Sequence, residues 1–265
     1  MNRAQALADV ACALAAEGRK AEAISVARTI EDPYFRACAL RATIAHLTQP
    51  DDRNRSLEET LAATRSIEDP NRRAQVLCYI APLMTHLEES MKLLSEALSA
   101  VGDAAATASP EDLPQSHARD YALRNIACAL GTLSKTEEAL TLAQSIDEPY
   151  FRADALSNIA LSLVSAGQLE AAISVVRTIL DPPARMKALA GMASMLAVAG
   201  NIEAAVSVAR TMEDPFHHAA ALSSIAPYIT PPKEKVYIWE EALSGRPQFV
   251  RRNSEVLISQ ELRLI

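Results

Sequence analysis

An α-solenoid, an array of stacked helix pairs, is the fold class that the sequence predicts. The first observation is a phrase, Ile-x-Asp-Pro-x-x-Arg-x-x-Ala-Leu, that starts at Ile30 and returns with variations at Ile67, Ile146, Ile179 and Met212. The second is that apolar residues between these phrases fall at i, i+3, i+4 and i+7, the period of an amphipathic helix. The third is that only seven glycines occur in 265 residues, which is few for a sheet protein rich in tight turns. Repetition at a fixed period is typical of solenoids, in which each repeat buries its core against its neighbours.

The first helix of each unit carries the motif Arg-x-x-(Ala/Val)-Leu-x-x-(Ile/Val/Met)-Ala, with small variations. Seven copies begin at Arg3, Arg36, Arg73, Arg119, Arg152, Arg185 and His218. The steps between them are 33, 37, 46, 33, 33 and 33 residues. We therefore expect about seven antiparallel helix pairs with a period near 33 residues, forming a single domain over residues 1–265.

A second helix follows the first in each unit. It is clearest over residues 18–30, 167–179 and 200–212. Each of these ranges opens on a glycine, which stands where the first helix is expected to end. A glycine at this place commonly adopts the left-handed conformation that terminates a helix.

The Asp-Pro step joins one unit to the next at Asp32, Asp69, Asp181 and Asp214. The aspartate can accept hydrogen bonds from the free amides that open the next helix, and proline is tolerated at the first helical position. A basic residue stands four positions after each aspartate, as Arg36 does after Asp32. This spacing predicts an i, i+4 ion pair of about 0.2–0.5 kcal/mol.

The repeat is interrupted in two places. Residues 102–116, Gly-Asp-Ala-Ala-Ala-Thr-Ala-Ser-Pro-Glu-Asp-Leu-Pro-Gln-Ser, predict a long irregular loop between the third and fourth units, which either serves recognition or is a tolerated surface loop. At the other end, residues 247–265 depart from the repeat and predict a C-terminal capping helix over the last hydrophobic face.

Composition bounds the function. The net charge of −7 weighs against broad binding of nucleic acid, although a local basic patch is compatible with it. The sequence has no run of 18 apolar residues, so no membrane span is expected. The four cysteines, Cys12, Cys38, Cys78 and Cys128, form no C-x-x-C pair, which favours a reduced, cytoplasmic protein with no metal or cofactor.

These units resemble the tetratricopeptide repeat family over almost the whole chain. In the fifth unit the spacing of the family consensus is followed by Leu156, Ile159, Ala160, Leu163, Gly167 and Ala172. Three departures mark the array as degenerate: the period is 33 and not 34, the aromatic signature positions are aliphatic, and the proline arrives two residues early. A HEAT-like pairing is the alternative. The resemblance implies a right-handed superhelix whose first helices line a concave groove that binds peptides or proteins.

No phosphate-binding loop, zinc-protease motif or nucleophile elbow is present, so we expect a non-catalytic interaction module, an adaptor, scaffold or regulatory subunit of bacterial style. A sensor of a small ligand or signalling peptide is the alternative, and a helical-repeat enzyme ranks below it. On the family pattern, polar residues of the groove are the candidate protein- or peptide-binding residues. They are Arg41, His46, Tyr79, Tyr121, Arg124, Asn125, Asp154, Asn158 and Lys187.

Overall fold

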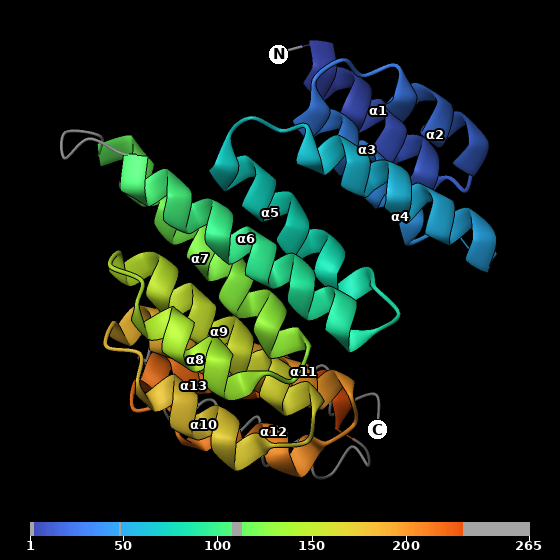
Figure 1. The fold of residues 1–265 in the computed structure, drawn as a ribbon. Helices are drawn as coiled ribbons and strands as arrows, with labels where there is room; N and C mark the ends of the chain where they lie inside the picture. The colour runs from blue at the N-terminus through green and yellow to red at the C-terminus, as the bar shows by residue number, and fades with distance from the viewer. Residues whose placement is uncertain (1–2, 48, 108–112, 230–265) are drawn as a thin grey trace. The chain divides into compact units, whose positions relative to one another are not determined.

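Helices account for all the regular secondary structure that the computed structural model describes, which covers residues 3–47, 49–107 and 113–229. The helices pack in pairs of sequence neighbours, so the predicted all-α solenoid is confirmed (Figure 1). Its right-handedness stays a prediction. Contacts between Cα atoms divide the chain into two compact units, residues 1–155 and 156–265, which we describe separately. The single domain expected from the sequence likewise stays a prediction.

The first unit is a double layer of helices. Its first-layer helices, each contacting the next, are α1 (Arg3–Ala16), α3 (Pro33–Ile44), α5 (Pro70–Ile80) and α7 (Leu113–Thr132). Its second-layer helices, each paired with the helix before it, are α2 (Lys20–Arg28), α4 (Pro50–Arg65), α6 (Leu87–Thr107) and α8 (Thr136–Gln144). A short 3-10 turn, η1 (Ala81–Leu83), continues α5.

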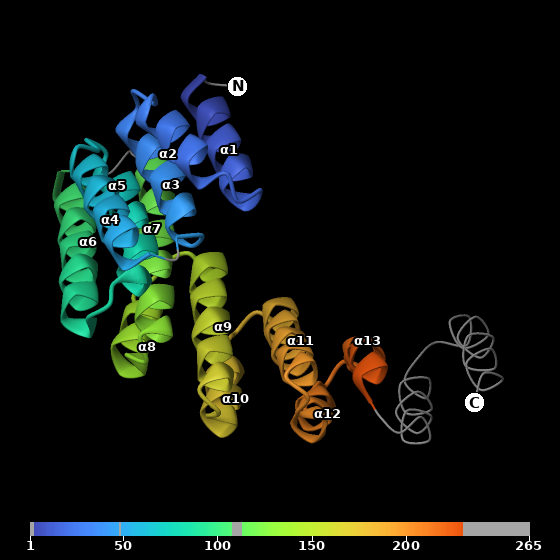
Figure 2. The same ribbon diagram turned by 90° about the vertical axis from the view of Figure 1, so that its right-hand side faces the viewer.

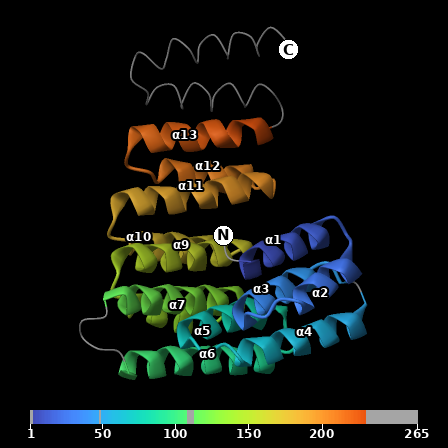
Figure 3. The same ribbon diagram turned by 90° about the horizontal axis from the view of Figure 1, so that it is seen from above.

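The second unit repeats this arrangement. It begins within α9 (Pro149–Ser165) and continues with α10 (Leu169–Arg177), α11 (Pro182–Val198), α12 (Ile202–Arg210), α13 (Pro215–Ile225) and the 3-10 turn η2 (Ala226–Tyr228). Figure 2 and Figure 3 show α11, α12 and α13 side by side, and α11 packs against both of the others. The capping helix expected over residues 247–265 lies outside the described residues.

The Asp-Pro steps start helices as expected. Asp32 Oδ1 accepts hydrogen bonds from the backbone amides of Tyr34 (2.9 Å) and Phe35 (3.1 Å). Asp181 accepts one from the amide of Ala184 at 2.8 Å. In each case proline occupies the first turn, where its missing amide donor leaves no hydrogen bond unmade. The predicted aspartate caps are confirmed.

The recurring arginine makes a different contact from the one predicted. The expected ion pair between Asp32 and Arg36 was wrong: Arg36 Nη1 donates to the backbone carbonyl of Ile30 at 3.2 Å. The same bond recurs six residues back from Arg73 (2.9 Å), Arg152 (3.0 Å) and Arg185 (3.0 Å). The aspartate already accepts backbone amides, whereas the carbonyls at the end of the preceding helix lack intrahelical partners. The arginine therefore ties each helix start to the end of the helix before it.

Four of the turns within the pairs place one residue in the left-handed conformation. Gly18, Gly167 and Gly200 have φ of +80°, +75° and +80°, as the sequence predicted. The equivalent turn between α7 and α8 places Ser134 at φ +61°. A residue with a Cβ is strained in this conformation, so the turn at Ser134 is less stable than the three turns that use glycine.

The loop predicted over residues 102–116 was wrong in its extent. Helix α6 continues through Gly102 to Thr107, and α7 has already begun at Leu113. The three alanines at 104–106 have the highest intrinsic helix propensity, which outweighs the cost of one exposed glycine. The interruption of the repeat thus consists largely of two longer helices, α6 with 21 residues and α7 with 20, while residues 108–112 lie outside the described residues.

The core is built from the repeated phrase itself. The isoleucine or methionine that opens each copy is buried, with Ile30, Ile146 and Ile179 each 1% exposed. Alanines such as Ala23 and Ala27 are fully buried between the layers. Small residues let helices approach closely, and each buried isoleucine contributes about 1.5–3 kcal/mol. Few aromatic side chains are needed to fill such a core.

Candidate functional site

A cluster of tyrosines joined by one glutamine lies on the first-layer helices of the first unit. Tyr34 Oη donates to Gln75 Oε1 at 3.2 Å, and Gln75 Nε2 donates to Tyr121 Oη at 3.4 Å. The same amide nitrogen lies 3.5 Å from Tyr79 Oη. Gln75 on α5 therefore links side chains of α3 and α7, which are separated by many residues in sequence. We call these four residues the tyrosine cluster.

Three arginines lie over rings of the tyrosine cluster, and the first, Arg72, which pairs with Asp69, is 5.2 Å from the centroid of Tyr34. The guanidinium of Arg41 lies over the ring of Tyr79, 5.1 Å from its centroid, and that of Arg124 lies 5.9 Å from the centroid of Tyr121. Such cation–π contacts hold a guanidinium flat against a ring. Arg124 also forms an ion pair with Asp154 of α9 and donates to Asn125 Oδ1 at 2.8 Å.

Two buried donors near the tyrosine cluster lack acceptors. Arg41 Nε and Asn125 Nδ2 have no hydrogen-bond partner among the described residues. The Asn125 side chain belongs to a residue only 3% exposed, so it is shielded from bulk solvent. Buried polar groups are nearly always hydrogen-bonded, and leaving one unpaired costs about 1–3 kcal/mol. Both donors are closed to solvent in this conformation, so an acceptor on a ligand reaches them only after the side chains around them move.

The electrostatics favour neutral tyrosines beside one arginine that no carboxylate of the described residues neutralises. Burial raises the pKa of Tyr34 to about 12 and also raises the pKa of Tyr79, so both phenols stay protonated at pH 7. Asp154 neutralises Arg124, whereas Arg41 forms no ion pair with a carboxylate in the described part of the chain. The surface accordingly offers hydroxyl groups, aromatic faces and a single uncompensated guanidinium.

The structure brings together most, but not all, of the predicted site residues. Those in or beside the tyrosine cluster are Arg41, Tyr79, Tyr121, Arg124, Asn125 and Asp154. His46 is exposed in the turn after α3, where its backbone amide donates to the Thr43 carbonyl. Asn158 and Lys187 belong to the second unit, Lys187 being exposed on α11.

Tyr34 and Gln75 were missed by the sequence analysis. Gln75 precedes Tyr79 by four residues, which places both on one face of α5. Tyr34 is part of Pro-Tyr-Phe-Arg, a tetrapeptide that recurs at residues 149–152 and that distinguishes these two helix starts from the others. A search for polar neighbours at i±4 of each tyrosine would have found Gln75.

Other kinds of site are not assembled in the described ranges. No group of three histidine, cysteine, aspartate or glutamate residues there is arranged to hold a metal ion. None of the helices described here combines the length and the apolar character that crossing a bilayer requires.

Comparisons with known proteins give little further guidance. No protein-family model matches the sequence, and no curated protein matches it. Among solved structures, the chain is similar to Ton1535 from Thermococcus onnurineus NA1, with 13% identity over 95% of this chain and 89% of that one, and a TM-score of 0.34. A TM-score this low does not establish a shared fold, so the function must be argued from the site.

Proposed function

We propose that the protein is a non-catalytic interaction module that binds an extended segment of a protein or peptide on the tyrosine cluster. The observation that carries this proposal is the pair of buried donors, Arg41 Nε and Asn125 Nδ2, that lack acceptors within the described residues. Backbone carbonyls of an extended segment are acceptors of the right kind, because a chain without secondary structure leaves its carbonyls free. Tyrosine and arginine, which surround these donors, are enriched at protein interfaces.

The repeat pattern and the cysteines bear on the family, the compartment and the role of the module. We infer a degenerate tetratricopeptide-like array that works in the cytoplasm as an adaptor, scaffold or regulatory subunit. The repeat pattern supports the first part. Free thiols at Cys12, Cys38, Cys78 and Cys128 support a reducing compartment, since secreted repeat proteins commonly pair their cysteines.

A displayed library of random 12-residue peptides tests the binding surface. Peptides selected on the wild-type protein would be titrated calorimetrically against Arg41→Met and Asn125→Leu, which remove the unpaired donor together with the other polar atoms of the side chain and keep a side chain of similar size. We expect each substitution to weaken binding about 5- to 30-fold, the effect of one lost hydrogen bond of about 1–2 kcal/mol.

Arg65→Met is the matched control, because Arg65 is an exposed arginine of the second layer. It should leave affinity within twofold of wild type. Peptides that bind all three variants as tightly as the wild-type protein would show that the tyrosine cluster is not the binding surface.

A further inference from the structure

Arg41 on α3 carries a positive charge that no acidic group of the described residues balances. Its guanidinium lies over the ring of Tyr79, 5.1 Å from the centroid, and makes no hydrogen bond or ion pair with any described residue. Nε is enclosed, whereas the two terminal nitrogens of the side chain, Nη1 and Nη2, are not among the buried unpaired atoms. These two nitrogens therefore remain accessible and unpaired, so an acceptor can reach them in the conformation described.

The other two arginines that lie over rings of the tyrosine cluster are neutralised. Arg72 pairs with Asp69, with Nε and Oδ2 3.6 Å apart. Arg124 pairs with Asp154 of α9. A carboxylate this close cancels most of the attraction that a guanidinium exerts on an incoming anion. Of the three arginines, Arg41 is thus the one that attracts an acidic group most strongly.

Arg41 stands within the row of first-layer helices and not at its end. Helix α3, which carries it, packs against both α1 and α5. Tyr79 beneath the guanidinium belongs to α5. On α1, burial raises the pKa of the Cys12 thiol and the charge of Arg41 opposes that rise, so Arg41 also lies near α1. A segment that crosses these helices passes Arg41 with chain on both sides, which favours a side-chain group over a chain terminus as its partner.

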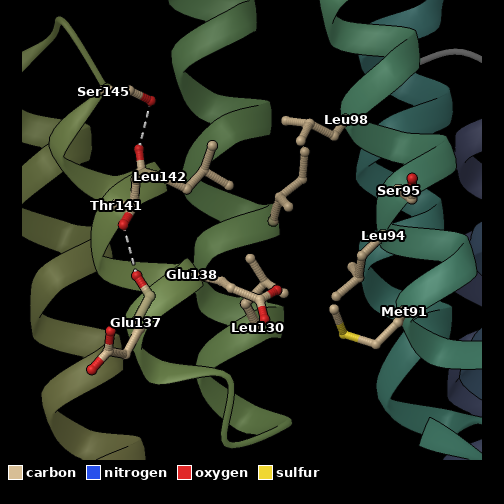
Figure 4. Close-up of a pocket in the computed structure, with 11 residues that line it drawn as sticks. Met91, Leu94, Ser95, Leu98, Leu130, Glu137, Glu138, Thr141, Leu142 and Ser145 are labelled. Atoms are coloured by element: carbon tan, nitrogen blue, oxygen red, sulfur yellow. Dashed lines mark hydrogen bonds between the residues drawn. The ribbon is translucent and has the colours of Figure 1, made fainter. Parts of the chain in front are cut away.

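A second surface of the first unit has the opposite charge. An open groove between α6 and α8 has apolar walls that include Met91, Leu94 and Leu142, and Glu137 and Glu138 also line it (Figure 4). No basic residue is among the described residues that line this groove. An acidic segment is therefore repelled there and attracted by Arg41.

We propose that Arg41 binds the carboxylate of an aspartate or glutamate side chain in the segment that the tyrosine cluster holds, an inference that rests on the proposed function. The two oxygens of a carboxylate match the two terminal nitrogens of a guanidinium, because they accept two parallel hydrogen bonds. A phosphate matches less well, since it carries a charge of about −1.5 to −2 at neutral pH and is commonly bound by several arginines. The net charge of −7 also disfavours a polyanion.

The test uses a displayed library of random 12-residue peptides, selected on the full chain and then synthesised with amidated C-termini. We expect an acidic residue to recur at one position of the selected sequences. Replacing it by its amide, glutamine or asparagine, should weaken binding to the wild-type protein at least about tenfold, because hydrogen bonds between charged groups are lost. On Arg41→Met the acidic peptide and its amide should bind within twofold of each other. Calorimetric titration measures all four affinities.

Arg72→Met is the matched control, because Arg72 also lies over a tyrosine ring, 5.2 Å from the centroid of Tyr34, but already has Asp69 as its partner. On this variant the amide peptide should lose as much affinity as it loses on the wild-type protein. Circular dichroism checks that the variants fold. Arg41→Gln gives the same comparison should Arg41→Met fail to fold.

Failure of this inference is distinguishable from failure of the proposed function. Peptides that Asn125→Leu weakens still bind the tyrosine cluster; if they contain no recurring acidic residue, or if the amide costs as much affinity on Arg41→Met as on the wild-type protein, carboxylate binding is overturned and the binding surface stands. Loss of binding on amidation of the C-terminus would assign Arg41 to a terminal carboxylate and overturn the proposal. A phosphoserine at the acidic position that binds more than about tenfold tighter than glutamate would assign it to phosphate, with the same consequence.

Discussion

At the scale of single residues, Ser134 is the clearest departure from the pattern of the repeats. Its φ of +61° lies where three other pairs use glycine. The left-handed conformation costs a residue with a Cβ about 1–2 kcal/mol, while glycine loses about 0.5–1 kcal/mol more backbone entropy on folding. The balance favours glycine at this position.

We therefore expect Ser134→Gly to raise the free energy of unfolding by about 0.5–1 kcal/mol. The reciprocal change, Gly167→Ser, should lower it by a similar amount, because no atom lies within 4 Å of the added Cβ and only the backbone is strained. Urea denaturation followed by circular dichroism measures both. A lower urea midpoint for Ser134→Gly would contradict the assignment of strain.

The cysteines differ in reactivity because they differ in burial. Cys12 is exposed, whereas burial raises the pKa of Cys128 to about 11 and places the pKa of the buried Cys78 higher still. At pH 8 only about one Cys128 thiol in a thousand is then a thiolate, the reactive form.

Iodoacetamide at pH 8 should accordingly label Cys12 first and Cys78 last, as peptide mass spectrometry can follow. Raising the pH to 10 increases the thiolate fraction of Cys128 about a hundredfold and should speed its labelling more than that of Cys12. Cys78 reacting before Cys12 in the folded protein would contradict the described burial.

At the scale of helices, the recurring contact between one repeat and the next is made by the arginine that donates to a carbonyl at the end of the preceding helix. Arg185 donates to the Ile179 carbonyl at 3.0 Å, a charge-assisted bond that is worth about 1.5–3 kcal/mol where it is shielded from water. Arg185 is only half-buried, so the lower end of that range applies.

Arg185→Met should lower the free energy of unfolding by about 1–2 kcal/mol. Arg177→Met, at an exposed arginine on α10, should change it by less than about 0.5 kcal/mol. Thermal denaturation of both variants measures the difference. Equal effects of the two substitutions would mean that the hydrogen bond from Arg185 to the Ile179 carbonyl contributes no stability.

The helix starts, the left-handed glycines and the buried isoleucines could be predicted from the sequence, because each depends on a local pattern. The arginine contact could not, since the competing acceptor, the Ile30 carbonyl, belongs to the preceding helix. Gln75 was missed for a similar reason: its partners Tyr34 and Tyr121 lie on other helices. The end of α6 was also predicted wrongly, because an exposed glycine disfavours a helix interior while the alanines that follow Gly102 favour it.

At the scale of the whole molecule, contacts are made mainly between helices close in sequence. Helix α5, for example, packs against α3, α4, α6 and α7. In such an array a perturbation is expected to spread to adjacent helices and then fade, because stability is a sum of local and nearest-neighbour contributions.

Leu77→Ala, at a fully buried position of α5, should destabilise its surroundings by about 2–5 kcal/mol. Hydrogen exchange read by mass spectrometry should show faster exchange in α3 to α7 and unchanged exchange in α11 to α13. Met192→Ala in α11, where Met192 is also fully buried, should give the opposite distribution. Uniform acceleration along the described chain in either variant would contradict nearest-neighbour stability.

The Asp-Pro junction has a consequence for how such a chain can change in length. Removing residues 182–214 would place Asp181 directly before Pro215 and thereby recreate the same junction, with an aspartate cap, a proline at the first helical position and a whole period of 33 residues lost. The same Asp-Pro connection stands at Asp32, Asp69 and Asp214. Deletion or duplication of one such 33-residue repeat therefore leaves the connection between neighbouring repeats unchanged.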